Sequence, residues 1–359
     1  MTNCFDSSDK IIERYRMLSR KTGHRGGSPV RFGGIEVVNK AERYLQAATR
    51  ENTRKSYRAA VEHFEATWGG FLPATGDSIV RYLAHYADQH TISTLKQRLA
   101  ALAQWHITQG FPDPTKTPTV RQMIKGIRVV HPAREKQAEP LLLRHLEQAV
   151  SWMQREAGLA AQRNDLKSVM RHRRDIALVL IGFWRGFRGD ELARLEVENT
   201  QAEAGVGISF YLARTKGDRQ HVGTTFRTPA LNALCPVDAY INWITTAGIA
   251  HGPVFRRLDR WGNLAEDAIN QNSLIPMLRR IFAQAGVPAE LYSSHSLRRG
   301  FATWASANGW DLKSLMSYVG WKDVKSAVRY LDGTSPFGAL ARAQQLPQPP
   351  AVAIGQDPA

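Results

Sequence analysis

The sequence predicts a mainly α-helical protein of two domains, with a small antiparallel β-sheet in the second domain. The chain has 359 residues, which is enough for about two domains of roughly 100–200 residues each. Apolar residues recur at helical spacing through most of the chain from residue 41 onward. A charged segment with prolines near its two ends, residues 131–140, separates two such helical regions and predicts an interdomain linker.

The first domain is predicted to be a four-to-five-helix unit over residues 41–130. Residues 1–40 are polar, basic and rich in glycine and serine, and they predict a flexible arm. The first clear helix is expected to be capped by Asn52 or Thr53. Three further helices are expected to follow Asp77, to begin near Thr91, and to span about Thr119 to Val130.

The second domain, residues 141–332, is predicted to be helical with one β-hairpin. Its strands are expected over residues 208–215 and 221–226, which are rich in β-branched and aromatic residues and flank a Gly-Asp turn. Helices are predicted near 142–156, 171–184, 236–247, 270–285, 296–307, 311–319 and 323–331. A short helix is expected within 333–346, and the Pro- and Gln-rich residues 347–359 predict a disordered tail.

The charge balance indicates a polyanionic partner. Lysine and arginine total 48 against 32 acidic residues, a formal excess of +16, so nucleic acid ranks first and an anionic membrane second. The longest apolar run, Ile176–Trp184, is about half of a membrane span, and the N-terminus lacks the apolar run of a signal peptide. Cys4 and Cys235 have neither disulfide nor metal-ligand spacing. These features predict a cytoplasmic protein without a membrane partner.

The first domain offers basic side chains on its last two helices. The candidates for phosphate contact are Lys96, Arg98, Arg121, Lys125 and Arg128. The last three lie at positions i, i+4 and i+7, so they share one helix face. An ordinary solvated face is the alternative interpretation of this stripe. If it binds DNA, it is expected to give affinity rather than sequence choice.

Six residues of the second domain together suggest phosphoryl transfer. Individually, each has an ordinary explanation: Arg188 as an ion-pair partner of Glu191, Lys216 as a solvated turn residue, Tyr330 as a core residue. Taken together they indicate a phosphate-binding site, because two arginines with a histidine or an indole N–H can bind the nonbridging oxygens of a phosphodiester. A tyrosine can act as nucleophile and a lysine as general acid. The set is Arg188, Lys216, His295, Arg298, Trp321 and Tyr330. No carboxylate cluster with metal-binding spacing accompanies them, so no metal is predicted.

Over roughly residues 45–345 the sequence resembles the tyrosine recombinases, or phage integrases, and most closely the Cre type. In that family the first arginine lies in a motif matched here by Gly186-Phe187-Arg188-Gly189-Asp190-Glu191-Leu192. The lysine follows Arg-Thr in a hairpin, here Arg214-Thr215-Lys216, and the second box is His-x-x-Arg, here His295 and Arg298. Trp321 follows a glycine, and Tyr330 comes nine residues later. Trp321 replaces a commoner histidine, as in Cre-type enzymes, and Gly189 replaces a commoner bulky apolar residue, which could loosen the helix after Arg188.

The resemblance implies a tyrosine recombinase fold and a site-specific DNA recombinase. Tyr330 would form a 3′-phosphotyrosyl intermediate and Lys216 would protonate the leaving oxygen. Arg188, Arg298 and Trp321 would hold the phosphate, while His295 assists as a base or hydrogen-bond partner. Glu191 would orient Arg188. The bond energy is conserved in the phosphotyrosine, so neither metal nor other cofactor is expected.

The resemblance also implies an assembly on double-stranded DNA. The first domain would be a core-binding, SAM-like DNA-binding domain that grips DNA opposite the catalytic domain. Four protomers, monomeric in solution, would bring together two sites with inverted repeats and exchange strands through a Holliday junction. Such a protein would be encoded by a bacterium, phage or mobile element and associate with the nucleoid. The short helix within 333–346 would contact a neighbouring protomer, or alternatively fold back on its own domain.

Two other functions remain open at this point. The first is a type IB topoisomerase, which shares the chemistry but works as a monomer without strand exchange. The spacing of His295, Arg298, Trp321 and Tyr330, and the tail after Tyr330, favour the recombinase. The second is a non-catalytic DNA-binding protein on the same fold, which would not require Lys216 and Tyr330 at these positions.

Overall fold

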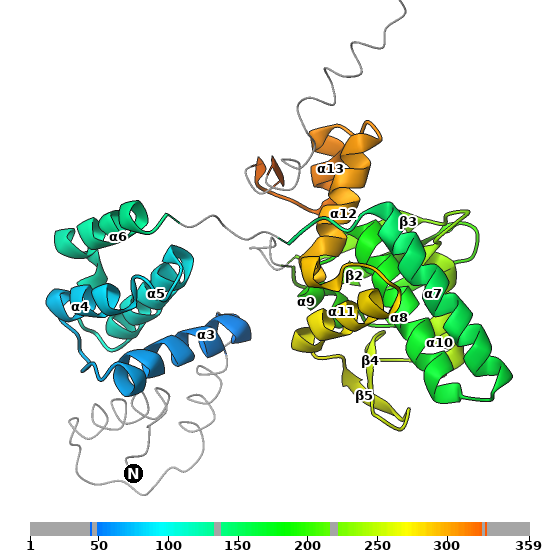
Figure 1. Cartoon of the computed structure of the whole chain (residues 1–359), viewed down its shortest axis with the longest axis horizontal. Coiled ribbons are helices and arrows are strands. Elements are labelled where there is room, and N and C mark those ends of the chain that lie inside the picture. Colours follow the sequence, from blue (N-terminus) through cyan, green and yellow to red (C-terminus); the bar gives the residue numbers. More distant parts are fainter. Residues whose placement is uncertain (1–43, 45–48, 133–137, 216–221, 325–326, 329–359) are drawn as a thin grey trace, which may run out of the picture. The chain divides into compact units, whose positions relative to one another are not determined.

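A computed structural model describes residue 44 and residues 49–132, 138–215, 222–324 and 327–328 (Figure 1). The chain divides into two compact units, Met1–Glu135 and Lys136–Ala359. The boundary lies within the segment 131–140. The described residues are mostly helical with small antiparallel sheets, which confirms the predicted fold class. None of the helices in the described ranges is long and apolar enough to cross a membrane.

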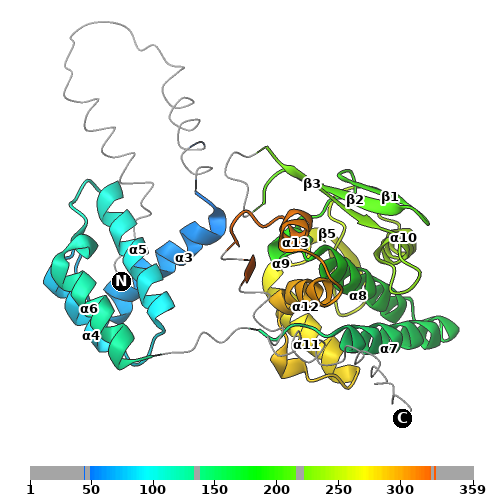
Figure 2. The same cartoon turned by 90° about the horizontal axis from the view of Figure 1, so that it is seen from above.

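The N-terminal unit is a helical bundle. Over residues 49–132 its α-helices are α3 (Glu51–Glu62), α4 (Gly76–Tyr86), α5 (Ile92–Thr108) and α6 (Pro118–Val130), with a π-helical turn η1 (His63–Thr67) and a 3-10 turn η2 (Pro114–Lys116). Helix α3 packs on α5, and α4 packs on α6 (Figure 2). The apolar faces meet in one core of Phe64, Ile79, Tyr82, Leu83, Leu95, Leu102, Val120 and Ile127. The apolar periodicity of the sequence therefore predicted the places of α4, α5 and α6.

The start of α3 differs from the sequence prediction. Helices α4, α5 and α6 begin with threonine caps, because Thr75, Thr91 and Thr117 accept hydrogen bonds from backbone N–H groups in the first turn. Helix α3 has Arg50 at its cap position and no side-chain cap, so the prediction of Asn52 or Thr53 as the cap was wrong. The first turn is instead supported by Glu51, whose carboxylate lies 2.6 Å from Lys55 and complements the helix dipole.

The C-terminal unit is built around one buried helix, α8 (Leu166–Arg185). Helices α7 (Leu143–Gln162), α10 (Pro236–Ala247) and α12 (Ser294–Ala307) pack against it. From Arg174 to Arg185 every residue of α8 is buried, which explains why this stretch is apolar with almost no polar face. Among the described residues, this unit also contains α9 (Gly189–Ala193), α11 (Leu274–Gln284) and α13 (Leu312–Val319), with 3-10 turns η3 (Gln271–Ser273) and η4 (Ala289–Leu291).

Two small antiparallel sheets complete this unit. Strands β1 (Thr200–Glu203), β2 (Gly207–Leu212) and β3 (Thr224–Pro229) form the first, in the order β1-β2-β3. Phe210 of β2 pairs with Phe226 of β3, and both rings contact Phe187. Strands β4 (Arg256–Leu258) and β5 (Leu264–Ala268) form the second. The predicted hairpin corresponds to β2 and β3, whereas β1, β4 and β5 were not predicted because they are short and largely polar.

Candidate active site

Arg188 lies at the junction between two helices. Helix α8 ends at Gly186, whose φ of +63° is a left-handed conformation that favours glycine. Arg188 then serves as the N-cap residue of α9. Its backbone N–H donates to Oε2 of Glu191 at 2.8 Å, and its Nη1 donates to Oε1 of the same carboxylate at 2.7 Å. Glu191, which is 3% exposed, therefore fixes both the backbone and the guanidinium of Arg188.

Arg298 approaches the same carboxylate from α12. Its side chain is 1% exposed, and its Nη1 lies 3.8 Å from Oε2 of Glu191. The guanidinium also donates to the carbonyl oxygen of Gly186 at 2.5 Å and to that of Val319 at 3.3 Å. These bonds tie the ends of α8 and α13 to α12. Glu191 thus lies between two arginines that are 110 residues apart in the sequence.

Trp321 completes this group. Helix α13 ends at Gly320, with φ of +73°, and the Trp321 backbone N–H donates to the Met316 carbonyl oxygen at 2.9 Å. The Trp321 side chain is buried, and the Arg298 guanidinium carbon lies 5.1 Å from its ring centre. The structure therefore brings Arg188 and Arg298 together at Glu191, with Trp321 against Arg298.

His295 is exposed in the first turn of α12, three residues before Arg298 and therefore on the same side of the helix. Lys216 and Tyr330 lie outside the described residues, as do Cys4 and the short helix predicted within 333–346. The chain just before Lys216 is held by Arg194, whose Nη1 donates to the Arg214 carbonyl oxygen at 2.9 Å. Arg194 also pairs with Asp190 of α9 at 2.5 Å.

Gly189 is tightly packed. A Cβ at this position would lie 3.0 Å from Leu274 and 3.4 Å from Ser294. Helix α9 is also held at its start by the bond from the Arg188 backbone to Glu191. The expectation that Gly189 loosens this helix is therefore not what the packing indicates, because a small residue lets α9 approach α11 and α12 closely.

The basic side chains of the N-terminal unit differ in their surroundings. Lys96, Arg121, Lys125 and Arg128 are exposed. The α6 stripe lies away from Val120 and Ile127, which face the core. Arg98 is half-buried instead, and its Nη1 lies 2.8 Å from Nδ1 of His63 and donates to the Tyr82 hydroxyl at 2.9 Å. Arg98 therefore contacts a histidine–tyrosine cluster within its own unit.

Metal ligation has no support among the described residues, where no group of three or more His, Cys, Asp or Glu side chains could hold a metal ion. Cys235 is a free thiol that caps α10, its Sγ lying 3.5 Å from the Asp238 backbone nitrogen. The arginine–carboxylate site has the opposite character, because it offers guanidinium donors to an anion.

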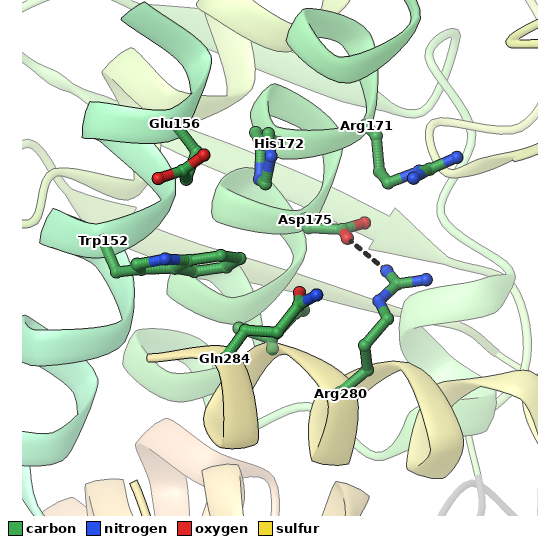
Figure 3. A pocket seen from close by; sticks show the side chains of 8 residues that line it. Trp152, Glu156, Arg171, His172, Asp175, Arg280 and Gln284 are labelled. Atoms are coloured by element: carbon green, nitrogen blue, oxygen red, sulfur yellow. Dashed lines mark hydrogen bonds and ion pairs between the residues drawn. The ribbon is translucent and has the colours of Figure 1, made fainter. Parts of the chain in front are cut away.

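A separate polar pocket of about 160 Å³ lies among α7, α8 and α11 (Figure 3). Its central carboxylate, Asp175, accepts hydrogen bonds from Arg174 and Arg280. Trp152, Glu156 and His172 line the pocket. Burial lowers the pKa of His172, an effect that Asp175 and Glu156 oppose. The pocket contains none of the residues that surround Glu191.

Residues 160–335 match the profile of the phage integrase family. An integrase/recombinase XerD homolog from Selenomonas ruminantium is 30% identical over 310 residues, which cover 83% of this chain and 86% of the relative. The chain belongs to the phage integrase family. It is a tyrosine-type site-specific recombinase, as the resemblance in its sequence implied.

Other relatives and solved structures agree with this assignment. Recombinase Cre of Escherichia phage P1 is 25% identical over 76% of this chain and 80% of its own length. The XerH recombinase bound to a palindromic difH substrate, in a post-cleavage complex, has a TM-score of 0.54 and 17% identity over 81% of this chain and 79% of that chain. A lambda integrase dimer bound to a COC′ core site has a TM-score of 0.51 and 14% identity over 85% and 97% of the two chains. These structures share the fold of this recombinase.

Sequence reasoning missed two arginines that lie beside the site in this recombinase. Arg194 links α9 to the strand end before Lys216. Arg185 is buried at the end of α8, three residues before Arg188. A signal for Arg185 existed, because it directly follows the apolar run Ile176–Trp184. A cation in the last turn of a helix is common, however, and does not by itself indicate a site.

Proposed function

We propose that this recombinase cleaves and rejoins double-stranded DNA through a covalent 3′-phosphotyrosyl intermediate at Tyr330. The observation that supports this proposal is the placement of Glu191 between Arg188 and Arg298, with Trp321 against Arg298. The guanidinium and indole N–H groups are donors that suit the nonbridging oxygens of a phosphodiester. Such donors stabilise the charge that develops on those oxygens in the transition state.

The reaction divides among the remaining residues. The Tyr330 phenol oxygen attacks the scissile phosphorus, and the bond to the 5′ oxygen of the next nucleotide breaks. Lys216 donates a proton to that oxygen, so the products are a phosphotyrosyl bond and a free 5′-hydroxyl. His295 assists as a base or hydrogen-bond partner. Because the phosphotyrosyl bond conserves the energy of the broken phosphodiester, religation needs no nucleotide cofactor, and the donor set requires no metal.

Strand exchange between two sites follows from the same chemistry. A 5′-hydroxyl from one duplex attacks the phosphotyrosine of the other and generates a Holliday junction. We propose that four protomers, monomeric in solution, assemble on two inverted-repeat sites. The N-terminal unit would contact phosphates through Lys96 and the α6 stripe, and the segment 333–346 would contact the neighbouring protomer.

A suicide DNA substrate tests the proposal, because a nick near the scissile phosphate lets the cleaved strand diffuse away and traps the covalent complex. The wild-type protein is expected to form this complex in excess EDTA. Tyr330→Phe keeps the ring but removes the attacking oxygen, so it should bind the site and form no covalent complex. A covalent complex with the Phe variant, or cleavage that requires added magnesium, would overturn the proposal.

The topoisomerase alternative is distinguished with a supercoiled plasmid that carries two sites. A recombinase yields deletion or inversion products that depend on both sites. Relaxation without such products would favour the topoisomerase.

A further inference from the structure

Arg185 is a buried cation enclosed by aromatic rings at the base of the candidate site. Its side chain is 4% exposed. The guanidinium carbon lies 4.1 Å from the ring centre of Tyr318, 4.7 Å from that of Phe226 and 5.9 Å from that of Phe187. The three rings belong to α13, to β3 and to the turn before Arg188. Helix α13 leads to Trp321 in the sequence, β3 follows Lys216, and the turn carries Arg188.

The environment of Arg185 is costly for a charge. Its Nε and Nη1 are buried and have no hydrogen-bond partner among the described residues. Burial lowers the pKa of Arg185 to about 10, and the Tyr318 hydroxyl and the Glu191 carboxylate oppose this shift. The side chain is therefore still a cation at neutral pH. An apolar residue of similar volume would avoid the desolvation penalty, so packing alone does not account for an arginine here.

Arg185 adds a third positive charge to the part of the structure where one carboxylate, Glu191, contacts two arginines. Glu191 contacts Arg188 at 2.7 Å and Arg298 at 3.8 Å, and its negative charge opposes the lowering of the Arg185 pKa. Glu191 and Asp175 are the buried carboxylates of the described residues, and Asp175 pairs with Arg174 and Arg280 instead. The group around Glu191 therefore has two positive charges in excess.

We propose that Arg185 is a positioning residue for phosphoryl transfer, whose buried positive charge lies next to the group of Arg188, Glu191 and Arg298. Its charge adds to the positive charge that Arg188 and Arg298 present to the scissile phosphate, and so offsets the negative charge of Glu191, which orients Arg188. The inference rests on the proposed function, because it assumes that an anionic phosphodiester binds beside these two arginines. It adds a cation that does not touch the DNA but sets how strongly the site attracts a negative charge.

The test compares two substrates that differ in charge at one position. One suicide substrate has an ordinary scissile phosphodiester, and the other has a methylphosphonate there, which has no negative charge. Arg185→Met should slow single-turnover cleavage of the phosphodiester by about tenfold, because a buried charge beside the site is lost. On the methylphosphonate the cleavage rate of the same variant should fall by less than about threefold, since this substrate lacks the negative charge that the Arg185 cation attracts. Arg185→Lys retains a positive charge but not the planar group that stacks on the rings, so it should cleave the phosphodiester faster than Arg185→Met and more slowly than wild type.

Arg174→Met is the matched control, because Arg174 is also a buried arginine of α8 but pairs with Asp175 instead of Glu191. Any effect it has should be equal on the two substrates. Equal losses for Arg185→Met on the two substrates, or an Arg185→Lys variant as slow as Arg185→Met, would overturn the proposal. Arg185→Gln is a second neutral variant, and if neither neutral variant folds, the role is structural and the proposal fails. Failure of the proposed function gives a different result on the phosphodiester substrate. In that case the wild-type protein forms no covalent complex, or Tyr330→Phe still forms one.

Discussion

The carboxylate of Glu191 holds Arg188 at two points, accepting from its backbone N–H at 2.8 Å and from its Nη1 at 2.7 Å. Glu191→Gln keeps the shape but replaces one acceptor oxygen by an N–H₂ donor, which must face either the Arg188 N–H or a guanidinium. Charged hydrogen bonds contribute about 1.5–3 kcal/mol, so we expect cleavage to slow by about tenfold to a hundredfold. Single-turnover cleavage of a suicide substrate measures this effect.

Binding to a half-site should change little in Glu191→Gln, because the defect lies in the orientation of Arg188. The exposed Glu196→Gln, five residues away in the sequence, is the control and should cleave at the wild-type rate. A Gln variant that cleaves as fast as wild type would show that Glu191 does not orient Arg188.

Arg194 is predicted to support DNA cleavage by positioning the proposed general acid, Lys216. Its bond to the Arg214 carbonyl oxygen holds the chain two residues before Lys216. Arg194→Met should slow cleavage of ordinary DNA by about threefold to tenfold, the size expected for one lost hydrogen bond. A 5′-bridging sulfur leaves without much need for protonation, so the defect should largely disappear on a phosphorothiolate substrate. Lys216→Ala is the reference and should show the same pattern more strongly.

Asp190→Asn separates the two contacts of Arg194, because it weakens the ion pair on α9 and leaves the bond to Arg214 available. It should therefore cost less than Arg194→Met on ordinary DNA. If Arg194→Met were equally impaired on both substrates, Arg194 would not act through Lys216.

The salt dependence of DNA binding should locate the phosphate contacts of the N-terminal unit. Each phosphate contact contributes about −0.9 to the slope of log K against log salt. Replacing Arg121, Lys125 and Arg128 together by alanine should therefore make the slope less negative by about 2–3. Arg98→Met should leave the slope unchanged and lower the thermal stability, because Arg98 bonds to His63 and Tyr82. Fluorescence anisotropy at several salt concentrations measures the slope. An unchanged slope in the triple variant would remove the stripe from the interface.

Arg98 also illustrates what the sequence could and could not predict. Helix positions and the α6 stripe follow from local periodicity, and the Arg188–Glu191 pair follows from an i, i+3 spacing. The partners of Arg98 on η1 and α4 lie 35 and 16 residues away, and those of Arg298 at Gly186 and Val319 lie 112 and 21 residues away. No local pattern encodes such contacts. The cage around Arg185 was missed for the same reason, since its rings come from separate elements.

The cluster around Arg98 should make stability depend on pH. Burial lowers the pKa values of His63 and His90, and the charge of Arg98 lowers them further. A histidine whose pKa is lower in the folded state binds more protons when unfolded. Its contribution to stability is therefore complete above the unfolded pKa of about 6.5 and is lost as the pH falls through the folded value. The neighbouring His85, Tyr82 and Tyr86 contribute no carboxylate that could offset the added charge.

We therefore expect the melting temperature of the N-terminal unit to fall between pH 7.5 and pH 5.5, by about 4–8 °C for each kcal/mol lost in a unit of this size. The double variant His63→Gln, His90→Asn should show a smaller fall. His145 and His172 also have pKa values lowered by burial, but they are present in both proteins and cancel in the comparison. Parallel pH profiles for the two proteins would contradict the assignment to this cluster.

The final prediction concerns assembly through the end of the chain. After Tyr330, Gly333 and Pro336 can end one helix and begin another, and Phe337, Leu340 and Ala341 would form a short apolar stripe on it. A helix of about ten residues is marginal alone in water, so it requires a partner surface. If that surface belongs to the next protomer, the contact is heterologous and can close a ring. It would also couple each Tyr330 to its neighbour, because only a few residues separate them.

Truncation after Asp332 should therefore leave binding of one monomer to a half-site intact. Cooperative filling of the full site should weaken and recombination should be lost, which gel-shift titrations and a two-site plasmid assay measure. Phe337→Ser in the full-length chain is the matched control, since it removes one apolar anchor without shortening the protein, and it should reduce cooperativity in the same direction. A truncated protein that binds the full site cooperatively and recombines would show that the segment folds back on its own domain or has no role in assembly. Loss of half-site binding would instead show that the segment stabilises its own catalytic domain, because a contact between protomers cannot affect a single bound monomer.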